Sequence, residues 1–173
     1  MQAPSPLILT CQLNPEAQDL FTALRQKHFP PERNFLQAHL TLFHHLPPGE
    51  PEIVAGIEDM IRSYAPLVLP ITEVVFTGRG VAYKVQSMEL KALHLSLQQR
   101  WKTWLIPQDQ QGLWPHITIQ NKVDPWQARQ LQQELAASFE PFEIRAEGLS
   151  LWEYQGGPWE FVRSFLFEGQ KSF

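Results

Sequence analysis

The chain has 173 residues, a length that suits one domain, or two tightly fused halves, burying about 70% of its unfolded surface. Six tryptophans and eleven phenylalanines are enough to build a core of that size. The formal net charge of −4 and the pI near 5.8 argue against the broad cationic surface that long duplex nucleic acid requires. A small basic patch can still hold one phosphate, so any nucleic-acid substrate is expected to be short or terminal.

Cysteine usage and hydropathy restrict the cellular setting. The single Cys11 lies in an apolar stretch, which rules out a disulfide within the chain and predicts a buried free thiol in a reducing compartment. No apolar run approaches the roughly 18 residues of a membrane span, and the N-terminus has neither the basic start nor the cleavage site of a secretory signal. We therefore expect a soluble cytoplasmic protein.

The first elements are a strand, a helix and a second strand. The apolar run Leu7–Leu13 predicts a buried strand, and Asn14-Pro15-Glu16 supplies an N-cap, a first-turn proline and an acid that open a helix. Pro30-Pro31 ends that helix, and alternating side chains predict a strand over Ala38–His45. After the break at Pro47-Pro48-Gly49, apolar residues at helical spacing continue to residue 64, and strand-like residues follow over Leu67–Phe76.

The second half has a similar order of elements. A strand over Val81–Val85 precedes a helix with apolar residues from Leu90 to Leu105, and a further strand begins at His116. Asp124-Pro125 then opens another helix. Two final strands flank a Gly-Gly-Pro turn, over Phe142–Trp152 and Trp159–Phe167.

Each half carries one copy of the same four-residue pattern. The copies are His39-Leu40-Thr41-Leu42 and, 77 residues downstream, His116-Ile117-Thr118-Ile119. Residues two apart on a strand share a face, so each copy places an imidazole beside a hydroxyl, with apolar side chains behind them. The chain offers this arrangement twice, each time on a predicted strand.

The matching order of elements indicates an ancient duplication. Helices after the two motifs begin near Glu50 and Asp124, an offset of 74 residues that is close to the 77 between the motifs. We expect an α+β domain with pseudo-twofold symmetry, built of lobes over approximately 1–78 and 79–173, whose terminal strands can cross between lobes. If the axis passes between the motif strands, both histidines face one central cleft.

Two histidines and two threonines brought together form a phosphate site. One imidazole can remove a proton from an attacking oxygen while the other protonates the leaving oxygen, and the hydroxyls can bind the non-bridging oxygens. This chemistry needs no metal. One alternative is that the histidines merely pack at strand ends and the threonines reflect β-propensity. Another is a zinc site, although the chain has no cysteine pair and no His-x₃₋₅-His or His-Glu-x-x-His spacing on a helix.

The paired motifs, in this order and at this separation, resemble those of the two-histidine (2H) phosphoesterases, which include the bacterial RNA 2′,3′-cyclic phosphodiesterases, also named 2′-5′ RNA ligases. The resemblance runs from Leu7 through the extension Gln120-Asn121-Lys122-Val123 to the terminal strands. It implies a bilobed fold with two antiparallel sheets lining a central cleft and helices outside, a metal-free site, and chemistry at phosphodiesters beside a ribose hydroxyl. On this resemblance the catalytic residues are His39, Thr41, His116 and Thr118.

Other side chains are candidates for holding a ribonucleotide, which needs surfaces for stacking and cations for its phosphate. Candidate stacking residues are Phe43, Trp114, Tyr83 and Trp152, and candidate cations are Arg33, Arg79, Lys84 and Lys122. Phe43 shares the strand parity of His39, and Trp114 lies just before the second motif, which favours these two. The remaining histidines are interpreted as solvated strand-end residues (His44, His45) or as structural residues (His28, His94).

These observations predict a monomeric, metal-independent phosphoesterase without a cofactor. It would open 2′,3′-cyclic phosphates, or cleave 2′-5′ phosphodiesters, at RNA ends or in small nucleotides, with 2′-5′ ligation as the minor reverse reaction. Our working assignment makes His116 the base and His39 the acid, and the coupled pair predicts a bell-shaped pH–rate profile. A module that binds phosphate or nucleotide without turnover, and a noncatalytic scaffold, are the alternatives from other functional classes.

Overall fold

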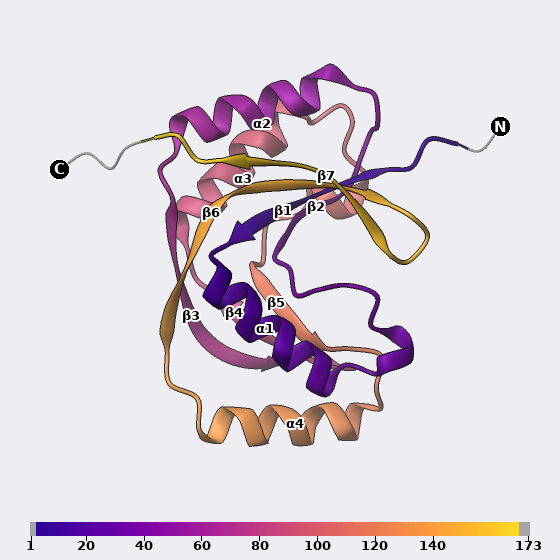
Figure 1. The fold of residues 1–173 in the computed structure, drawn as a ribbon, viewed down its shortest axis with the longest axis vertical. Helices are drawn as coiled ribbons and strands as arrows, with labels where there is room; N and C mark the ends of the chain where they lie inside the picture. The colour runs from indigo at the N-terminus through magenta and orange to yellow at the C-terminus, as the bar shows by residue number, and fades with distance from the viewer. Residues whose placement is uncertain (1–2, 170–173) are drawn as a thin grey trace.

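The computed structural model describes residues 3–169, in which seven strands form one antiparallel sheet and four α-helices cover it (Figure 1). The α+β class predicted from the sequence is confirmed. The two expected antiparallel sheets are parts of this single sheet. Within the described residues, no helix combines the length and apolar character that crossing a membrane would demand.

The two halves of the chain show the predicted repeat of elements. The first half contains β1 (Leu7–Leu13), α1 (Pro15–His28), the short 3₁₀ helix η1 (Pro31–Arg33), β2 (Thr41–Leu46), α2 (Pro51–Ser63) and β3 (Leu67–Phe76). The second contains β4 (Val81–Val85), α3 (Met88–Arg100), the 3₁₀ helix η2 (Pro107–Gln110), β5 (His116–Gln120), α4 (Pro125–Ala137), β6 (Phe142–Tyr154) and β7 (Trp159–Leu166).

Two predicted boundaries were wrong, and local hydrogen bonds explain both. Strand β2 begins at Thr41 and not at Ala38, because the carbonyl of Ala38 accepts a hydrogen bond from the side chain of Gln18 at 2.8 Å. Helix α3 ends at Arg100 and not at Leu105, because the chain continues in a tight turn in which the Trp104 amide donates to the Trp101 carbonyl.

Strand order connects the two repeats. The strand order in the sheet is β2-β1-β6-β3-β4-β5. Strand β7 pairs with residues 148–154, the C-terminal part of the long strand β6. Strand β3 of the first repeat pairs with β4 of the second, while β6 of the second pairs with β1 of the first. Each repeat therefore contributes its third strand to the other, and the division of the chain into lobes near residue 78 stays a prediction.

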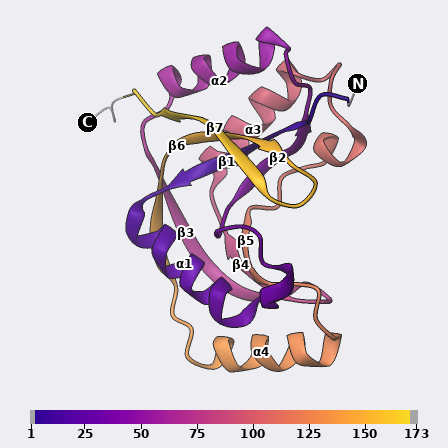
Figure 2. The same cartoon turned by 45° about the vertical axis from the view of Figure 1, so that its right-hand side comes forward.

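The helices lie at different places around this sheet. Figures 1 and 2 show α2 at one end of the molecule and α4 at the other, with α1 in front of β4 and β5. Helices α2 and α3 pack closely at Gly56, where an added Cβ would lie 2.9 Å from the indole nitrogen of Trp101. Helix α1 of the first repeat packs against β5 of the second, which brings the surroundings of the two motifs together.

Candidate active site

Both motif histidines are held by the same backbone hydrogen bond. The Nδ1 atom of His39 lies 2.9 Å from the carbonyl oxygen of Gln37, and Nδ1 of His116 lies 2.7 Å from that of Trp114. A carbonyl oxygen can only accept, so Nδ1 carries the hydrogen in each ring. The neutral imidazoles therefore leave Nε2 unprotonated and available to a substrate.

A tryptophan contacts each ring. Trp159 lies against His39 with ring centroids 4.5 Å apart, and Trp114 stacks on His116 at 4.2 Å with an interplanar angle of 26°. Such contacts restrict ring rotation, which preserves the direction of Nε2. The first tryptophan comes from β7, far from its histidine in the sequence, whereas the second comes from the loop directly before its histidine.

The threonines keep the strand alternation that the sequence predicts. Thr41 and Thr118 are partly exposed, whereas their neighbours Leu40, Ile117 and Ile119 are buried, with no more than traces of solvent-accessible surface. Each hydroxyl therefore lies on the face of its own histidine, above an apolar layer. A hydroxyl in this position can donate a hydrogen bond to a phosphate oxygen.

The buried Arg25 links the two motif segments. From α1 its Nε donates to the carbonyl of Leu36, three residues before His39, and its Nη1 donates to the carbonyl of Thr118 in the second motif. The side chain of Asn34 accepts a further bond at 2.8 Å. Sequence reasoning missed this residue, since an arginine inside a helix gives no sign of a buried cross-link.

Burial controls the charge of His39. Desolvation by its surroundings is the largest cause that lowers its pKa to about 4, and the bond to the Gln37 carbonyl opposes that shift. The positive charges of Arg25, His116 and His44 lower the pKa further. One of these charges belongs to His116, the histidine of the second motif.

Burial also lowers the pKa of His116 below its ordinary value, with the Trp114 carbonyl opposing the shift and the charge of His44 adding to it. Both motif imidazoles are therefore neutral near pH 7 in the free protein. A bound phosphate would favour their protonated forms, because a negative charge nearby raises the pKa of an imidazole.

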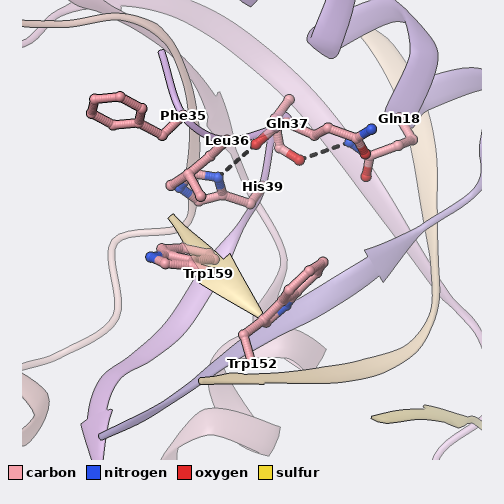
Figure 3. A pocket seen from close by; sticks show the side chains of 8 residues that line it. Gln18, Phe35, Leu36, Gln37, His39, Trp152 and Trp159 are labelled. Carbon is pink, nitrogen blue, oxygen red and sulfur yellow. Dashed lines mark hydrogen bonds between the residues drawn. The ribbon is translucent and has the colours of Figure 1, made fainter. Parts of the chain in front are cut away.

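An aromatic cavity of about 310 Å³ opens beside His39. Phe35, Leu36, Trp152 and Trp159 line it together with the histidine, and Figure 3 shows the Trp159 ring next to His39 with Trp152 beyond it. The Trp152 indole is fixed by a 2.9 Å bond from Nε1 to the hydroxyl of Thr10. A second cavity of about 360 Å³ adjoins it, lined in part by Thr10, Gln12, Ser150 and the same histidine.

Comparison with protein families shows to which superfamily the chain belongs. Residues 13–158 match the model of the 2′-5′ RNA ligase superfamily. The chain belongs to this superfamily. The resemblance to the 2H phosphoesterases that the two motifs indicated is confirmed. Among curated proteins, none has a sequence that matches the chain significantly.

Solved structures share the fold of this superfamily member. The protein TT0787 of Thermus thermophilus matches with a TM-score of 0.70 and 19% identity, over 96% of this chain and 100% of that one. LigT of E. coli complexed with 3′-AMP matches with a TM-score of 0.60 and 18% identity, over 95% of this chain and 99% of that one. At these identities the likeness establishes the fold and not the substrate.

For two residues of this 2H phosphoesterase, Phe43 and Tyr83, the prediction of a stacking contact with the substrate was wrong. Phe43 has no exposed surface and stacks on His94 in the core, because an extra residue in β2 reverses the alternation on which its prediction depended. Tyr83 is only 6% exposed and packs its ring edge-on against Phe21 in the core. Neither ring can stack on a nucleobase in this structure.

Other predicted residues have varied positions. Trp114 contacts His116 and is 45% exposed, and Lys84 is the cross-strand partner of His116 on β4. Arg33 is exposed in η1, two residues before Phe35, and Lys122 is exposed in the loop after β5 with a positive φ of 63°. Arg79 is exposed and bonds the Val123 carbonyl through Nε. For these five residues a substrate contact stays a prediction.

Sequence reasoning missed most of the aromatic cavity. Only Trp152 had been considered, whereas Phe35 and Trp159 had not. A usable signal was the cluster of aromatic residues beside the predicted turn at 156–158, since aromatic side chains on a short hairpin cannot all be buried. No three histidine, cysteine or carboxylate side chains within residues 3–169 cluster closely enough to hold a metal ion. The metal-free site stays a prediction.

Proposed function

We propose that this protein hydrolyses 2′,3′-cyclic phosphates, or 2′-5′ phosphodiesters, at RNA ends or in small nucleotides by two-histidine acid–base catalysis. The observation that carries the proposal is the matched geometry of the two motifs. Each supplies an imidazole whose Nδ1 is bound to a backbone carbonyl and whose Nε2 is free, with a hydroxyl two residues away.

In the proposed reaction the phosphorus lies between His39 and His116. One neutral imidazole takes a proton from water as the new P–O bond forms, and the other, as imidazolium, protonates the ribose oxygen as its bond to phosphorus breaks. Thr41 and Thr118 donate hydrogen bonds to the two non-bridging oxygens while negative charge develops on them. Water adds across the phosphodiester, and the two histidines exchange protonation states.

The surroundings of the two histidines do not separate the base from the acid. Burial lowers the pKa of both rings, so both are neutral in the free protein, as a base must be. A phosphate in the site would raise the pKa of either ring and supply the imidazolium that the acid step needs. We keep His116 as the base and His39 as the acid, as the working assignment has it.

The aromatic cavity supports a nucleotide as the substrate. Phe35, Trp152 and Trp159 offer ring faces beside His39, and a nucleobase stacked on an aromatic side chain gains about 1–3 kcal/mol. The structures of E. coli LigT complexed with 3′-AMP, ATP and phosphate support the same class of ligand. An RNA terminus as the partner, a minor ligation activity, a monomeric state and a cytoplasmic location stay predictions.

The test is hydrolysis of 2′,3′-cyclic nucleotides, and of an RNA that ends in a 2′,3′-cyclic phosphate, in the presence of EDTA. We expect wild-type activity to survive the chelator and to fall by about 10² or more in both His39→Ala and His116→Ala. His45→Ala is the matched control, because His45 is exposed and outside both motifs. The chromatographic identity of the product shows which ester bond breaks.

The hydrolytic proposal fails if the wild-type protein turns over none of these substrates. If it nevertheless binds phosphate compounds in a calorimetric titration, the site is a binding module. If it binds none, a noncatalytic scaffold is the better description.

A further inference from the structure

Strand β2 contains an extra residue directly after Thr41. Thr41 is paired with Thr10 of β1, and Phe43 is paired with Leu9, the next residue along β1. Leu42 therefore has no partner of its own, and both Leu42 and Phe43 are buried. Such a bulge shifts the alternation of the side chains that follow it.

A second irregularity follows at once. Phe43 and Leu46 are both paired with β1, and two residues, His44 and His45, lie between them where β1 has only Ile8. Both histidines are exposed. Phe43 and Leu46 therefore lie on the core face of the sheet. The two histidines lie opposite Ile8, on the opposite face of the sheet.

This other side is the face of the catalytic motif. Ile8 and Thr10 are two residues apart on β1 and share a face, and Thr10 is the partner of Thr41. A residue opposite Ile8 lies about 6.6 Å along the strand from one opposite Thr10. The backbone thus places His44 one side-chain repeat beyond Thr41, on the face that holds the reacting phosphate in our proposal.

Asp109 in η2 fixes the orientation of His44. This carboxylate is only 3% exposed and accepts hydrogen bonds from the backbone amides of His44 and His45, each at 2.9 Å, and from Nδ1 of His44 at 3.2 Å. Burial would raise the pKa of Asp109, but these bonds outweigh it and hold the pKa below its usual value. Because the carboxylate only accepts, Nδ1 of His44 carries a hydrogen and Nε2 is left free.

The His44 ring is accessible and electrostatically close to the site. Its side chain is 47% exposed, while the positive charge of its protonated form contributes to lowering the pKa of both His39 and His116. The neighbouring His94 differs, since it is buried and stacked on Phe43. His44 is thus a third histidine, exposed to solvent, whose charge acts on both of the others.

We propose that His44 binds a second anionic group of the substrate, a phosphate next to the reacting one, and that Asp109 is the positioning residue that holds the ring for this contact. The identity of the reacting phosphate rests on the proposed function. The contact with the second anion rests on the course of β2 and on the buried carboxylate. The subsite would favour substrates with two phosphate groups over substrates with one.

The experiment compares the affinities of adenosine 2′-monophosphate and adenosine 2′,5′-bisphosphate by titration calorimetry. We expect the wild-type protein to bind the bisphosphate about tenfold more tightly, in line with one charge-assisted hydrogen bond. His44→Ala should lose that advantage and keep its affinity for the monophosphate, and Asp109→Asn should lose part of it. His45→Ala is the matched control and should behave as the wild type does, because Asp109 contacts the backbone amide of His45 and not its ring.

Two results would overturn the subsite: no preference for the bisphosphate in the wild type, or a preference that survives His44→Ala. If that variant loses affinity equally for both ligands, the preference survives and His44 has a structural role, which a lowered melting temperature would corroborate. Binding requires no turnover, so the two proposals fail separately. An inactive protein with the preference intact contradicts only the hydrolysis, and an active protein without the preference contradicts only the subsite.

Discussion

His39 and His116 have the same local geometry and different surroundings. Each donates Nδ1–H to the carbonyl two residues earlier, and each is followed by a threonine on its own face. His39, however, borders an aromatic cavity and lies near the buried cation Arg25, whereas His116 stacks on a tryptophan that is 45% exposed. A repeated motif therefore gives equal backbone geometry, while residues distant in sequence make the two imidazoles chemically unequal.

The largest effect on activity should come from removing either of the two imidazoles. His39→Ala and His116→Ala are each expected to lower kcat/KM by about 10²–10⁴, because each removes one proton transfer. The double variant should be barely worse than the poorer single one, since two groups that act in one step are not additive. Steady-state kinetics on a 2′,3′-cyclic nucleotide measures this, and multiplicative losses would contradict a shared reaction step.

Substitutions of the two threonines should have similar effects on kcat. Thr41→Val and Thr118→Val each remove one hydrogen bond to a non-bridging oxygen and should lower kcat by about 10². Thr→Ser at either position keeps the hydroxyl and should restore most of the activity. A loss at only one position would mean that a single motif binds the developing charge.

The tryptophans should separate the two sides of the site. Trp159→Ala removes a wall of the aromatic cavity and should raise KM for a cyclic nucleotide about tenfold, as expected for a lost stacking contact. Trp114→Ala lies outside that cavity and should mainly lower kcat, by freeing the His116 ring. The KM and kcat of both variants test this, and the reverse pattern would move the nucleoside to the His116 side.

The burial of the His39 ring should make the free energy of unfolding depend on pH in mildly acidic solution. The pKa of His39 is about 4 in the folded state and about 6.5 without the fold, so between these values the unfolded chain binds the extra proton. The free energy of unfolding should therefore fall as the pH drops from about 6.5 to about 4, and should fall less in His39→Gln. Urea denaturation across this range gives the answer, and parallel curves for both proteins would argue that the ring is not desolvated.

Local sequence was sufficient for most of the elements and for the two motifs. A proline at the first turn opens α1, α2 and α4, and the alternation of exposed and buried residues in His116-Ile117-Thr118-Ile119 is present as predicted. The position of Phe43 could not be predicted, because a bulge depends on how β2 pairs with β1 and leaves no mark in the periodicity of one strand. Tyr83 was misplaced because an aromatic residue suits a stacking site and a core equally well.

Two imidazole–hydroxyl pairs, each backed by apolar residues, can be predicted from the sequence alone, because strand periodicity is a local property of the chain. The surroundings of these pairs depend on the tertiary structure. The aromatic cavity joins residues 35, 39, 152 and 159, and the Arg25 link joins α1 to β5. The Asp109 carboxylate reaches His44 of β2 from η2, 65 residues away in the sequence. Such contacts depend on the packing of the whole chain, including the pairing of β6 with β1 and of β3 with β4 between the repeats. They set the desolvation and the nearby charges that distinguish the two histidines.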